Sequence, residues 1–243
     1  MLLNYIFAVT LVLAVTSSHA SILSRIIGGY RVKIENFPFT VFLRVGNYKC
    51  AGTILTPSVI VTAAHCVSRS EEGFILAGAD DISKYGVRVN VAGRIIHPLY
   101  NKRPYDFDIA LLKLEHPLVY STRIGNVKLP KYSRNIEVNN GTALGWGQTY
   151  NINENEDYLR AVDLSVQRVC KFVAGVKIQE SMFCAGHPTK DTCKGDSGGP
   201  FVNNGVLYGI VSFGTTTCAS GQPGVFVKVP YVVNWIKKNL NNF

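Results

Sequence analysis

The sequence predicts an all-β protein made of two consecutive strand-rich units. Its composition is that of a folded chain, because 47% of the 243 residues are hydrophobic and only 17% are charged. Short runs rich in Val, Ile, Leu and Phe alternate with clusters of Gly, Pro, Asn and Ser, which is the pattern of strands joined by turns. Helical periodicity is nearly absent before Tyr231. We therefore expect strands to dominate up to that residue.

The first unit contains five such runs, and the second unit contains five more. A polar, turn-rich stretch separates them, and we place the boundary between the units at about residues 122–139. Strands spaced in this way form barrels or sandwiches, and the pattern alone leaves both architectures open. The predicted strands span residues 40–45, 51–62, 74–78, 86–96 and 108–114 in the first unit, and 142–146, 159–166, 182–185, 206–213 and 224–229 in the second.

The last predicted element is an amphipathic helix that begins near Tyr231. Lys237 and Lys238 fall in its last turns, where positive charge interacts favourably with the helix dipole. We expect this helix to pack on the second unit, and binding to a membrane or a partner is the alternative. The apolar residues at helical spacing are Val232, Val233, Trp235, Ile236 and Leu240.

Residues 1–20 have the features of a secretory signal peptide. An apolar core precedes Ser18-His19-Ala20, a small-x-small cleavage pattern, although no Lys or Arg precedes the core. A membrane anchor is the alternative, but the core is short for a bilayer span and is interrupted by Thr10. We therefore expect a secreted, extracellular protein with no membrane partner.

Six cysteines in a chain that is expected to be secreted predict three disulfides. Their order along the sequence leaves many pairings open. Free thiols or a zinc site are the alternatives, and no Cys-x-x-Cys or His-rich spacing supports them. We expect neither a metal nor any other cofactor.

The formal net charge of +9 would attract anionic partners over long distances. The Lys and Arg residues are nevertheless scattered, and their longest run is Lys237-Lys238. No nucleic-acid-binding motif accompanies them. The charge therefore predicts a solvated basic surface and no nucleic-acid partner.

The stretch 191–200, Asp-Thr-Cys-Lys-Gly-Asp-Ser-Gly-Gly-Pro, has the features of a nucleophile loop. A serine that attacks a carbonyl must stand clear of its own backbone. The glycines around Ser197 leave room for that attack and let main-chain N–H groups point into open space. The alternative is an ordinary Gly-rich turn between strands.

Two further motifs could supply the partners of such a serine. His65 lies in Val-Thr-Ala-Ala-His-Cys, and an imidazole that titrates near neutrality can take the serine proton and pass it to a leaving amine. Asp108 lies in Asp-Phe-Asp-Ile-Ala-Leu-Leu, and a buried carboxylate behind a histidine fixes its tautomer. Asp106 is the alternative carboxylate, and we expect it at the surface end of this strand.

These three motifs, in the order His65, Asp108, Ser197, resemble those of the chymotrypsin-like serine proteases, in the trypsin-like branch and of the invertebrate type. The resemblance covers nearly all of residues 26–243, which we interpret as the protease domain. It implies two six-stranded antiparallel β-barrels with the active site between them. It also implies that these three residues form a catalytic triad and that the N–H groups of Gly195 and Ser197 form the oxyanion hole.

The same resemblance implies a disulfide pattern and further properties. The stretch 71–91 lacks the arrangement of acidic residues expected of a calcium loop, so we assign no metal. The resemblance also implies a monomer, with protein protease inhibitors as expected partners. The implied pairs are Cys50 with Cys66, Cys170 with Cys184, and Cys193 with Cys218.

The segment around Arg25 resembles a zymogen activation site. Residues 21–25 would be a short propeptide, and Ile26-Ile27-Gly28-Gly29 resembles the start of the mature family members. The resemblance implies that cleavage after Arg25 frees the Ile26 ammonium, which pairs with the Asp196 carboxylate and opens the oxyanion hole and the specificity pocket.

Asp191, six residues before Ser197, would form the floor of that pocket. A carboxylate in a narrow, partly desolvated slot favours an entering Arg or Lys side chain. The resemblance implies pocket walls at Gly214 and Gly224, and a segment Ser212-Phe213-Gly214 that pairs with the substrate backbone. We therefore expect protein or peptide substrates that are cut after Arg or Lys.

Two other functions stay open at this level. One is a non-catalytic protease homologue that acts as a binding or immune cofactor module, and the other is a chymotrypsin-like specificity. The residues depart from the family pattern at Phe213, where Trp is common, and at Lys194, where an uncharged residue is common.

Two sites for modification or cleavage follow from short patterns. Asn140-Gly141-Thr142 is a glycosylation sequon, although Thr142 enters a predicted strand. Self-cleavage near the Asn-rich stretch 150–156 would require a basic residue, and Arg160 and Arg168 are the candidates.

Overall fold

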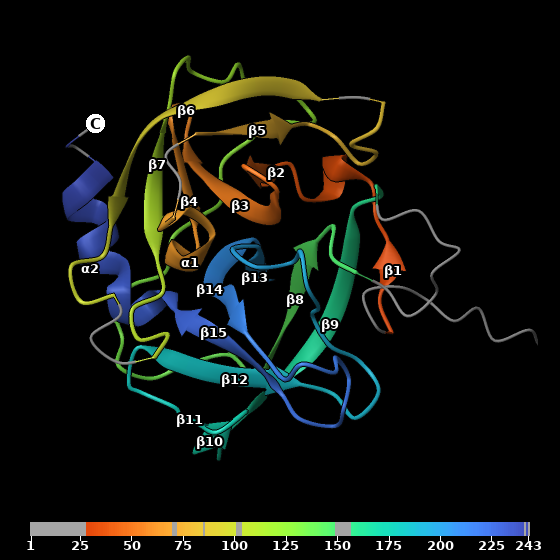
Figure 1. The fold of residues 1–243 in the computed structure, drawn as a ribbon, viewed down its shortest axis with the longest axis vertical. Coiled ribbons are helices and arrows are strands. Elements are labelled where there is room, and N and C mark those ends of the chain that lie inside the picture. The colour runs from red at the N-terminus through yellow and green to blue at the C-terminus, as the bar shows by residue number, and fades with distance from the viewer. Residues whose placement is uncertain are drawn as a thin grey trace, which may run out of the picture.

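Two closed β-barrels lie against each other, and a helix runs along one side of both (Figure 1). This computed structural model describes residues 28–69, 72–84, 86–100, 104–148, 157–240 and 242. The predicted all-β fold, with two six-stranded antiparallel barrels and a C-terminal helix, is confirmed. The expected signal peptide (1–20), the propeptide (21–25) and Ile26 lie outside the described residues.

The first barrel closes in the order β2-β3-β4-β7-β6-β5, and every neighbouring pair is antiparallel. Fully buried aliphatic side chains such as Leu43, Ile60 and Leu111 fill its interior. The predicted strand 51–62 is in fact two strands, because the chain turns at Pro57, which has no N–H for a sheet ladder. The strands are β2 (Thr40–Val45), β3 (Tyr48–Thr56), β4 (Val59–Thr62), β5 (Gly73–Ala77), β6 (Val87–Ile96) and β7 (Ala110–Leu114).

The second barrel closes in the order β9-β12-β15-β14-β13-β8, with β8 paired back onto β9. Short β1 (Tyr30–Arg31) adds to β9, and β10 (Phe172–Val173) pairs with β11 (Val176–Lys177). The sequence analysis missed these strands and β13, because two to four residues are too few to show an alternating pattern. The barrel strands are β8 (Asn140–Gly145), β9 (Arg160–Gln167), β12 (Met182–Gly186), β13 (Pro200–Asn203), β14 (Val206–Phe213) and β15 (Gly224–Lys228).

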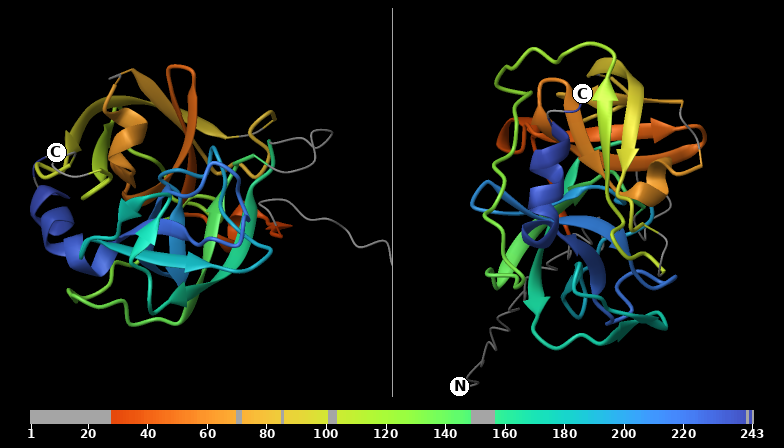
Figure 2. Two further views of the ribbon diagram at one scale, coloured as in Figure 1. Left: turned by 60° about the horizontal axis from the view of Figure 1, so that its bottom comes forward. Right: turned by 90° about the vertical axis from the view of Figure 1, so that its left-hand side faces the viewer.

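Helix α2 (Val229–Leu240) follows β15 directly and contacts both barrels. It packs against β14 of the second barrel, as expected. Its Trp235 ring also lies 4.8 Å from the ring of His97, which follows β6 of the first barrel. Both views in Figure 2 show α2 lying across the level at which the barrels meet. In the described part of the chain, no helix has both the length and the apolar character that a membrane crossing requires.

Residues 115–139 connect the barrels without forming a helix or a strand. Arg123 anchors this connection, since its guanidinium donates to the Gly78 carbonyl at 2.9 Å and pairs with Asp80 at 2.9 Å and with Glu35. The structure contains the disulfides Cys50–Cys66, Cys170–Cys184 and Cys193–Cys218, which are the pairs that the family resemblance implies.

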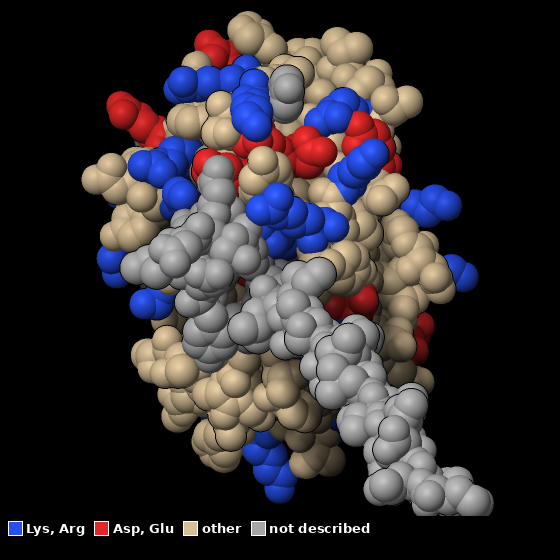
Figure 3. Space-filling view, turned by 90° about the vertical axis from the view of Figure 1, so that its right-hand side faces the viewer, with Lys and Arg blue, Asp and Glu red and all other residues tan. Residues whose placement is uncertain are grey.

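The charged residues do not gather into a single basic patch on the face shown in Figure 3. There, Lys and Arg side chains are interspersed with Asp and Glu over the upper half of the molecule. Arg160 is not a surface residue at all, because only 2% of it is exposed in β9. The expectation that Arg160 is a self-cleavage site is therefore wrong, whereas Arg168 is exposed.

Candidate functional site

His65 and Asp108 meet because they lie at the same end of two paired strands. His65 belongs to the one-turn helix α1 (Ala64–Val67), which begins directly after β4, and Asp108 lies just before β7. The antiparallel β4–β7 pair aligns Thr62 with Ala110 and so brings the two side chains together. His65 Nδ1 is 2.7 Å from Asp108 Oδ2, and the His65 backbone N–H donates to Asp108 Oδ1 at 2.8 Å. The carboxylate therefore holds both the ring and the backbone of His65.

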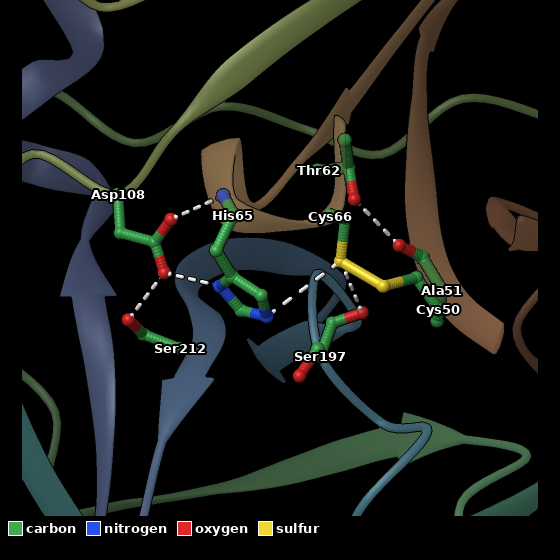
Figure 4. Close-up of polar contacts among 8 residues, drawn as sticks. All are labelled: Cys50, Ala51, Thr62, His65, Cys66, Asp108, Ser197 and Ser212. Atoms are coloured by element: carbon green, nitrogen blue, oxygen red, sulfur yellow. Dashed lines mark hydrogen bonds and ion pairs between the residues drawn. A yellow bond between two sulfur atoms is a disulfide. The ribbon is translucent and has the colours of Figure 1, made fainter. Parts of the chain in front are cut away.

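A hydroxyl from the second barrel completes the surroundings of Asp108. Ser212, in β14, donates to Asp108 Oδ2 at 2.6 Å (Figure 4). Asp108 is fully buried, whereas 27% of the His65 side chain is exposed. The sequence analysis placed Ser212 only in the substrate-binding segment, and this contact was missed because it joins residues 104 positions apart.

Asp106 does not lie where the sequence predicted. We expected it at the surface end of the strand, but it is only 8% exposed and accepts a hydrogen bond from the Ser181 hydroxyl. The cause is local, because Tyr105 and Phe107 have φ values of 58° and 49° and turn the chain between them inward. Asp106 therefore belongs to a separate buried contact and does not bond to His65.

Ser197 comes from the second barrel, in the loop that precedes β13. Its carbonyl oxygen accepts a hydrogen bond from Ala51 N–H of β3 at 2.8 Å, which ties the loop to the first barrel. Figure 4 shows Ser197 beside the Nε2 side of the His65 ring. Gly198, with φ +80°, must be glycine, because a Cβ there would collide with Thr62 Oγ1. Ser197 thus lies beside His65 across the seam between the barrels, Asp108 contacts His65 Nδ1, and His65 Nε2 lies 3.8 Å from Cys66 Sγ.

The backbone around Ser197 offers two candidate hydrogen-bond donors. Among the described residues, the N–H groups of Gly195 and Ser197 donate no backbone hydrogen bond. Gly195 has φ +100°, and a Cβ there would lie only 3.0 Å from the Gly147 Cα. Gln148 N–H donates to the Lys194 carbonyl at 2.7 Å and fixes the loop in place. These two N–H groups can bind an oxygen that gains negative charge in a reaction.

The Asp196 carboxylate holds the same loop from inside. Asp196 is 1% exposed and accepts hydrogen bonds from Gly147 N–H and Cys193 N–H, both at 2.8 Å. Burial raises the pKa of its carboxyl to about 7, although these two hydrogen bonds oppose the shift. A positive charge that reaches Asp196 would therefore stabilise the loop conformation by keeping the carboxylate ionised.

Asp191 is a buried acid in the loop that leads to Ser197. It is 2% exposed, and Ala219 N–H donates to its Oδ2 at 3.0 Å. Its Oδ1 has no hydrogen-bond partner. A Cβ added to Gly224 would lie 3.2 Å from this Oδ1 and 3.2 Å from the Thr192 hydroxyl, and one added to Gly214 would reach Gly224 at 4.0 Å. Burial raises the pKa of the Asp191 carboxyl to about 6.

An aromatic pair lies next to His65, and the sequence analysis missed one of its members, Tyr105. The Tyr105 ring stacks on Phe213 at 4.5 Å between centroids and meets the His65 ring edge-on at 6.4 Å. No signal in the sequence marks Tyr105, because its position depends on the turn before Asp108. Lys194, in the loop before Ser197, is exposed.

One group of side chains among the described residues has the spacing of metal ligands, namely Cys50, His65 and Cys66. The two sulfur atoms are bonded to each other in a disulfide. A disulfide leaves no thiolate to bind a metal, so this group is not a metal site.

Comparison with known proteins gives one consistent family. The family model described as Trypsin matches residues 26–236. Trypsin 5G1 of Aedes aegypti is 36% identical over 226 residues, which cover 88% of this chain and 84% of that protein. Hypodermin-B of Hypoderma lineatum is 36% identical over 233 residues (90% and 89%), and Cationic trypsin-3 of Rattus norvegicus is 36% identical over 222 residues (89% and 90%).

Replacement of Asp191 by Ser is expected to stabilise the fold at high pH. Burial raises the pKa of this Asp191 carboxyl to about 6, so the folded protein holds this proton up to a higher pH than the unfolded chain does. The free energy of unfolding therefore falls as the pH rises from about 4 to about 6 and stays lower above that range. Asp191→Ser removes this cost, so the gain at pH 8 is on the order of 2–3 kcal/mol and vanishes toward about pH 4. Urea unfolding at both pH values measures it. Glu137→Ser, at an exposed acid, is the control, and an equal gain at both pH values would contradict the prediction.

Proposed function

Because the chain belongs to the trypsin family of serine proteases, we propose that it is a secreted endopeptidase that cuts peptide bonds after Arg or Lys. It is made as a zymogen and is activated by cleavage after Arg25. Its substrates are proteins and peptides, it acts as a monomer, and protein protease inhibitors are its expected partners. The observation that carries the specificity is the buried Asp191 Oδ1, which has no hydrogen-bond partner.

The first half of the reaction forms an acyl-enzyme. The Ser197 hydroxyl attacks the scissile carbonyl while His65 Nε2 takes its proton, and the N–H groups of Gly195 and Ser197 bind the oxyanion. His65 then gives the proton to the leaving amine, and the peptide bond breaks. Asp108 stabilises the imidazolium that exists between these transfers, and its 2.7 Å contact with Nδ1 supports this role. In the second half, water attacks the ester with His65 again as the base.

A recess above Asp191, bordered by Gly214 and Gly224, would suit one class of side chain. An Arg or Lys side chain would pass between Gly214 and Gly224, which have no Cβ to obstruct it, and would reach Asp191 Oδ1. There it would supply the hydrogen bonds and the positive charge that the buried oxygen lacks. The Thr192 hydroxyl lies close to the same path and is a further acceptor. An apolar side chain would leave the carboxylate buried without a partner, which disfavours a chymotrypsin-like specificity.

The proposed zymogen mechanism involves residues 21–29, and the structure describes this segment from Gly28 onward. A Cβ on Gly28, two residues after Ile26, would lie 2.9 Å from the Thr189 carbonyl, so this segment runs next to the turn that leads to Asp191. Cleavage after Arg25 would create a free Ile26 ammonium two residues before Gly28, and we propose that it pairs with the buried Asp196. Ion pairing would keep that carboxylate ionised and hold the hydrogen bonds to Gly147 and Cys193.

A non-catalytic protease homologue is the second candidate function, and no specific feature of this chain favours it. Such a protein needs no nucleophile, base and acid, whereas this chain keeps Ser197, His65 and Asp108. Secretion is proposed from residues 1–20 and agrees with the three disulfides, which persist in oxidising compartments.

The processed protein should hydrolyse Arg and Lys amides about 10³-fold faster, as kcat/KM, than matched Phe or Leu amides. The reason is that only a cationic side chain satisfies Asp191. A serine-directed phosphonate should block the activity, and Ser197→Ala should abolish it. Asp191→Ser should lose the preference for Arg and Lys while still reacting with the phosphonate. A preference for Phe would contradict the pocket assignment, and no reaction with the phosphonate would contradict the proposed enzyme.

Cleavage after Arg25 should raise the activity by about 100-fold, equivalent to about 2.7 kcal/mol of transition-state stabilisation. N-terminal sequencing of the active form should begin at Ile26. Arg25→Gln should prevent both the cleavage and the rise in activity. A variant that carries another basic residue at position 25 should restore both. Full activity in the Arg25→Gln chain would show that no such switch exists.

Ser212→Ala should lower kcat by about tenfold with little change in KM, because it removes a donor from the buried Asp108 carboxylate. Its fold should lose about 1–3 kcal/mol in urea unfolding. Ser181→Ala is the matched control, since it removes the similar buried bond between a serine hydroxyl and Asp106. That variant should lose stability without losing kcat, and equal kcat values for the two variants would mean that Ser212 is only structural.

A further inference from the structure

Arg160 is a buried cation at the inner face of the second barrel. It is the first residue of β9, and side chains on a strand alternate between faces. Val162 and Leu164 of β9 point into the barrel core, so Arg160 shares their inward face. Only 2% of Arg160 is exposed. A guanidinium is ionised at all physiological pH values, so a full positive charge is kept inside this barrel.

The sheet register places Arg160 next to the Asp196 carboxylate. Arg160 lies directly opposite Gly145 of β8 in the antiparallel ladder. Residues that face each other in this way extend on the same side of the sheet. A Cβ built on Gly145 would collide with Asp196 Oδ1. The Asp196 carboxylate therefore occupies the space above Gly145, on the side to which Arg160 points.

Charges of both signs surround Asp196. Burial has the largest effect on the pKa of its carboxyl and raises it, and the N–H groups of Cys193 and Gly147 lower it. Of the nearby charges, Asp191 raises this pKa and Arg160 lowers it by a smaller amount. Arg31 is the cross-strand neighbour of Arg160 in β1, but it is exposed and lies over the Tyr158 ring at 4.0 Å. Of these side chains, Arg160 is the buried cation that favours the ionised form of Asp196.

We propose that Arg160 is a positioning residue that gives Asp196 a permanent positive neighbour, so that the chain keeps part of its active loop conformation before cleavage after Arg25. This inference rests on the proposed zymogen mechanism. The Ile26 ammonium is available only after cleavage and only while it holds its proton, whereas the Arg160 charge depends on neither condition. Its field acts on the carboxylate that receives the Gly147 and Cys193 N–H groups and so orders the loop that carries Gly195 and Ser197.

The test compares uncleavable chains. Arg25→Gln is combined with Arg160→Met, with Arg160→Lys, or with Arg168→Met, which removes an exposed arginine just after β9 and serves as the matched control. Two readouts are used: the rate of reaction with a serine-directed phosphonate, and the affinity for a fluorescent arylamidinium, which reports whether the recess above Asp191 is formed. We expect Arg160→Met to lower both by about tenfold or more, Arg160→Lys to restore most of the loss, and Arg168→Met to change neither.

The processed enzymes provide the second measurement. When the Ile26 ammonium loses its proton at alkaline pH, Arg160 remains charged, so activity should fall at a lower pH in Arg160→Met than in the unsubstituted enzyme. In Arg160→Lys, activity should fall at the same alkaline pH as in the unsubstituted enzyme. A loss of packing alone would not distinguish Lys from Met in this way. If Arg160→Met fails to fold, Arg160→Gln and Arg160→Lys give the same comparison, because they differ in charge at similar length.

The outcomes separate the inference from the proposed function. Equal phosphonate rates, equal arylamidinium affinities and equal alkaline limbs for Arg160→Met and its parent would overturn the role of Arg160 while leaving the protease assignment intact. A processed, unsubstituted protein that reacts with neither the phosphonate nor an Arg amide would overturn the proposed function itself.

Discussion

The hydrogen bond from Ala51 N–H to the Ser197 carbonyl, 2.8 Å long, is the contact on which the site depends. His65 and Asp108 belong to the first barrel and Ser197 to the second, so their alignment is set by how the barrels meet. Gly198 allows the approach, because any side chain there would collide with Thr62. Catalysis of the proposed kind loses rate steeply when the reacting groups move by about 1 Å. A single backbone contact at the seam therefore matters more to the chemistry than many contacts inside either barrel.

The buried carboxylates of Asp108, Asp196 and Asp191 lie near this seam, and they differ in how many hydrogen bonds their oxygens accept. The Asp108 carboxylate is hydrogen-bonded to His65 Nδ1, to the His65 backbone N–H and to the Ser212 hydroxyl. The Asp196 carboxylate accepts hydrogen bonds from two backbone N–H groups, while Asp191 Oδ1 has no hydrogen-bond partner. A carboxylate whose hydrogen bonds are all made within the protein orients its neighbours, whereas a buried carboxylate oxygen without a hydrogen bond attracts a cation from elsewhere. Asp108 therefore fits an orienting role, Asp196 fits a switch, and Asp191 fits substrate recognition.

Local pattern was sufficient to predict most strands and the nucleophile loop, because alternating apolar residues and the glycines around Ser197 act over a few positions. It was insufficient wherever a role arises from distant pairing. Ser212 reaches Asp108 through the contact between barrels, and Arg160 reaches Asp196 only because β8 and β9 align Gly145 opposite it. The sequence also could not show that Arg160 is buried, since a basic residue at a strand end is usually exposed.

The turn before Asp108 illustrates why such a site needs support from both barrels. Tyr105 and Phe107 both adopt positive φ, a conformation that costs on the order of 1 kcal/mol or more for a residue with a side chain. Aromatic stacking offsets this cost, since Phe107 lies 4.4 Å from the His97 ring and Tyr105 lies 4.5 Å from Phe213 of β14. The stacking energy is comparable in size to the strain. The position of Asp108 behind His65 is thus held by side chains of the second barrel as well as by its own strand.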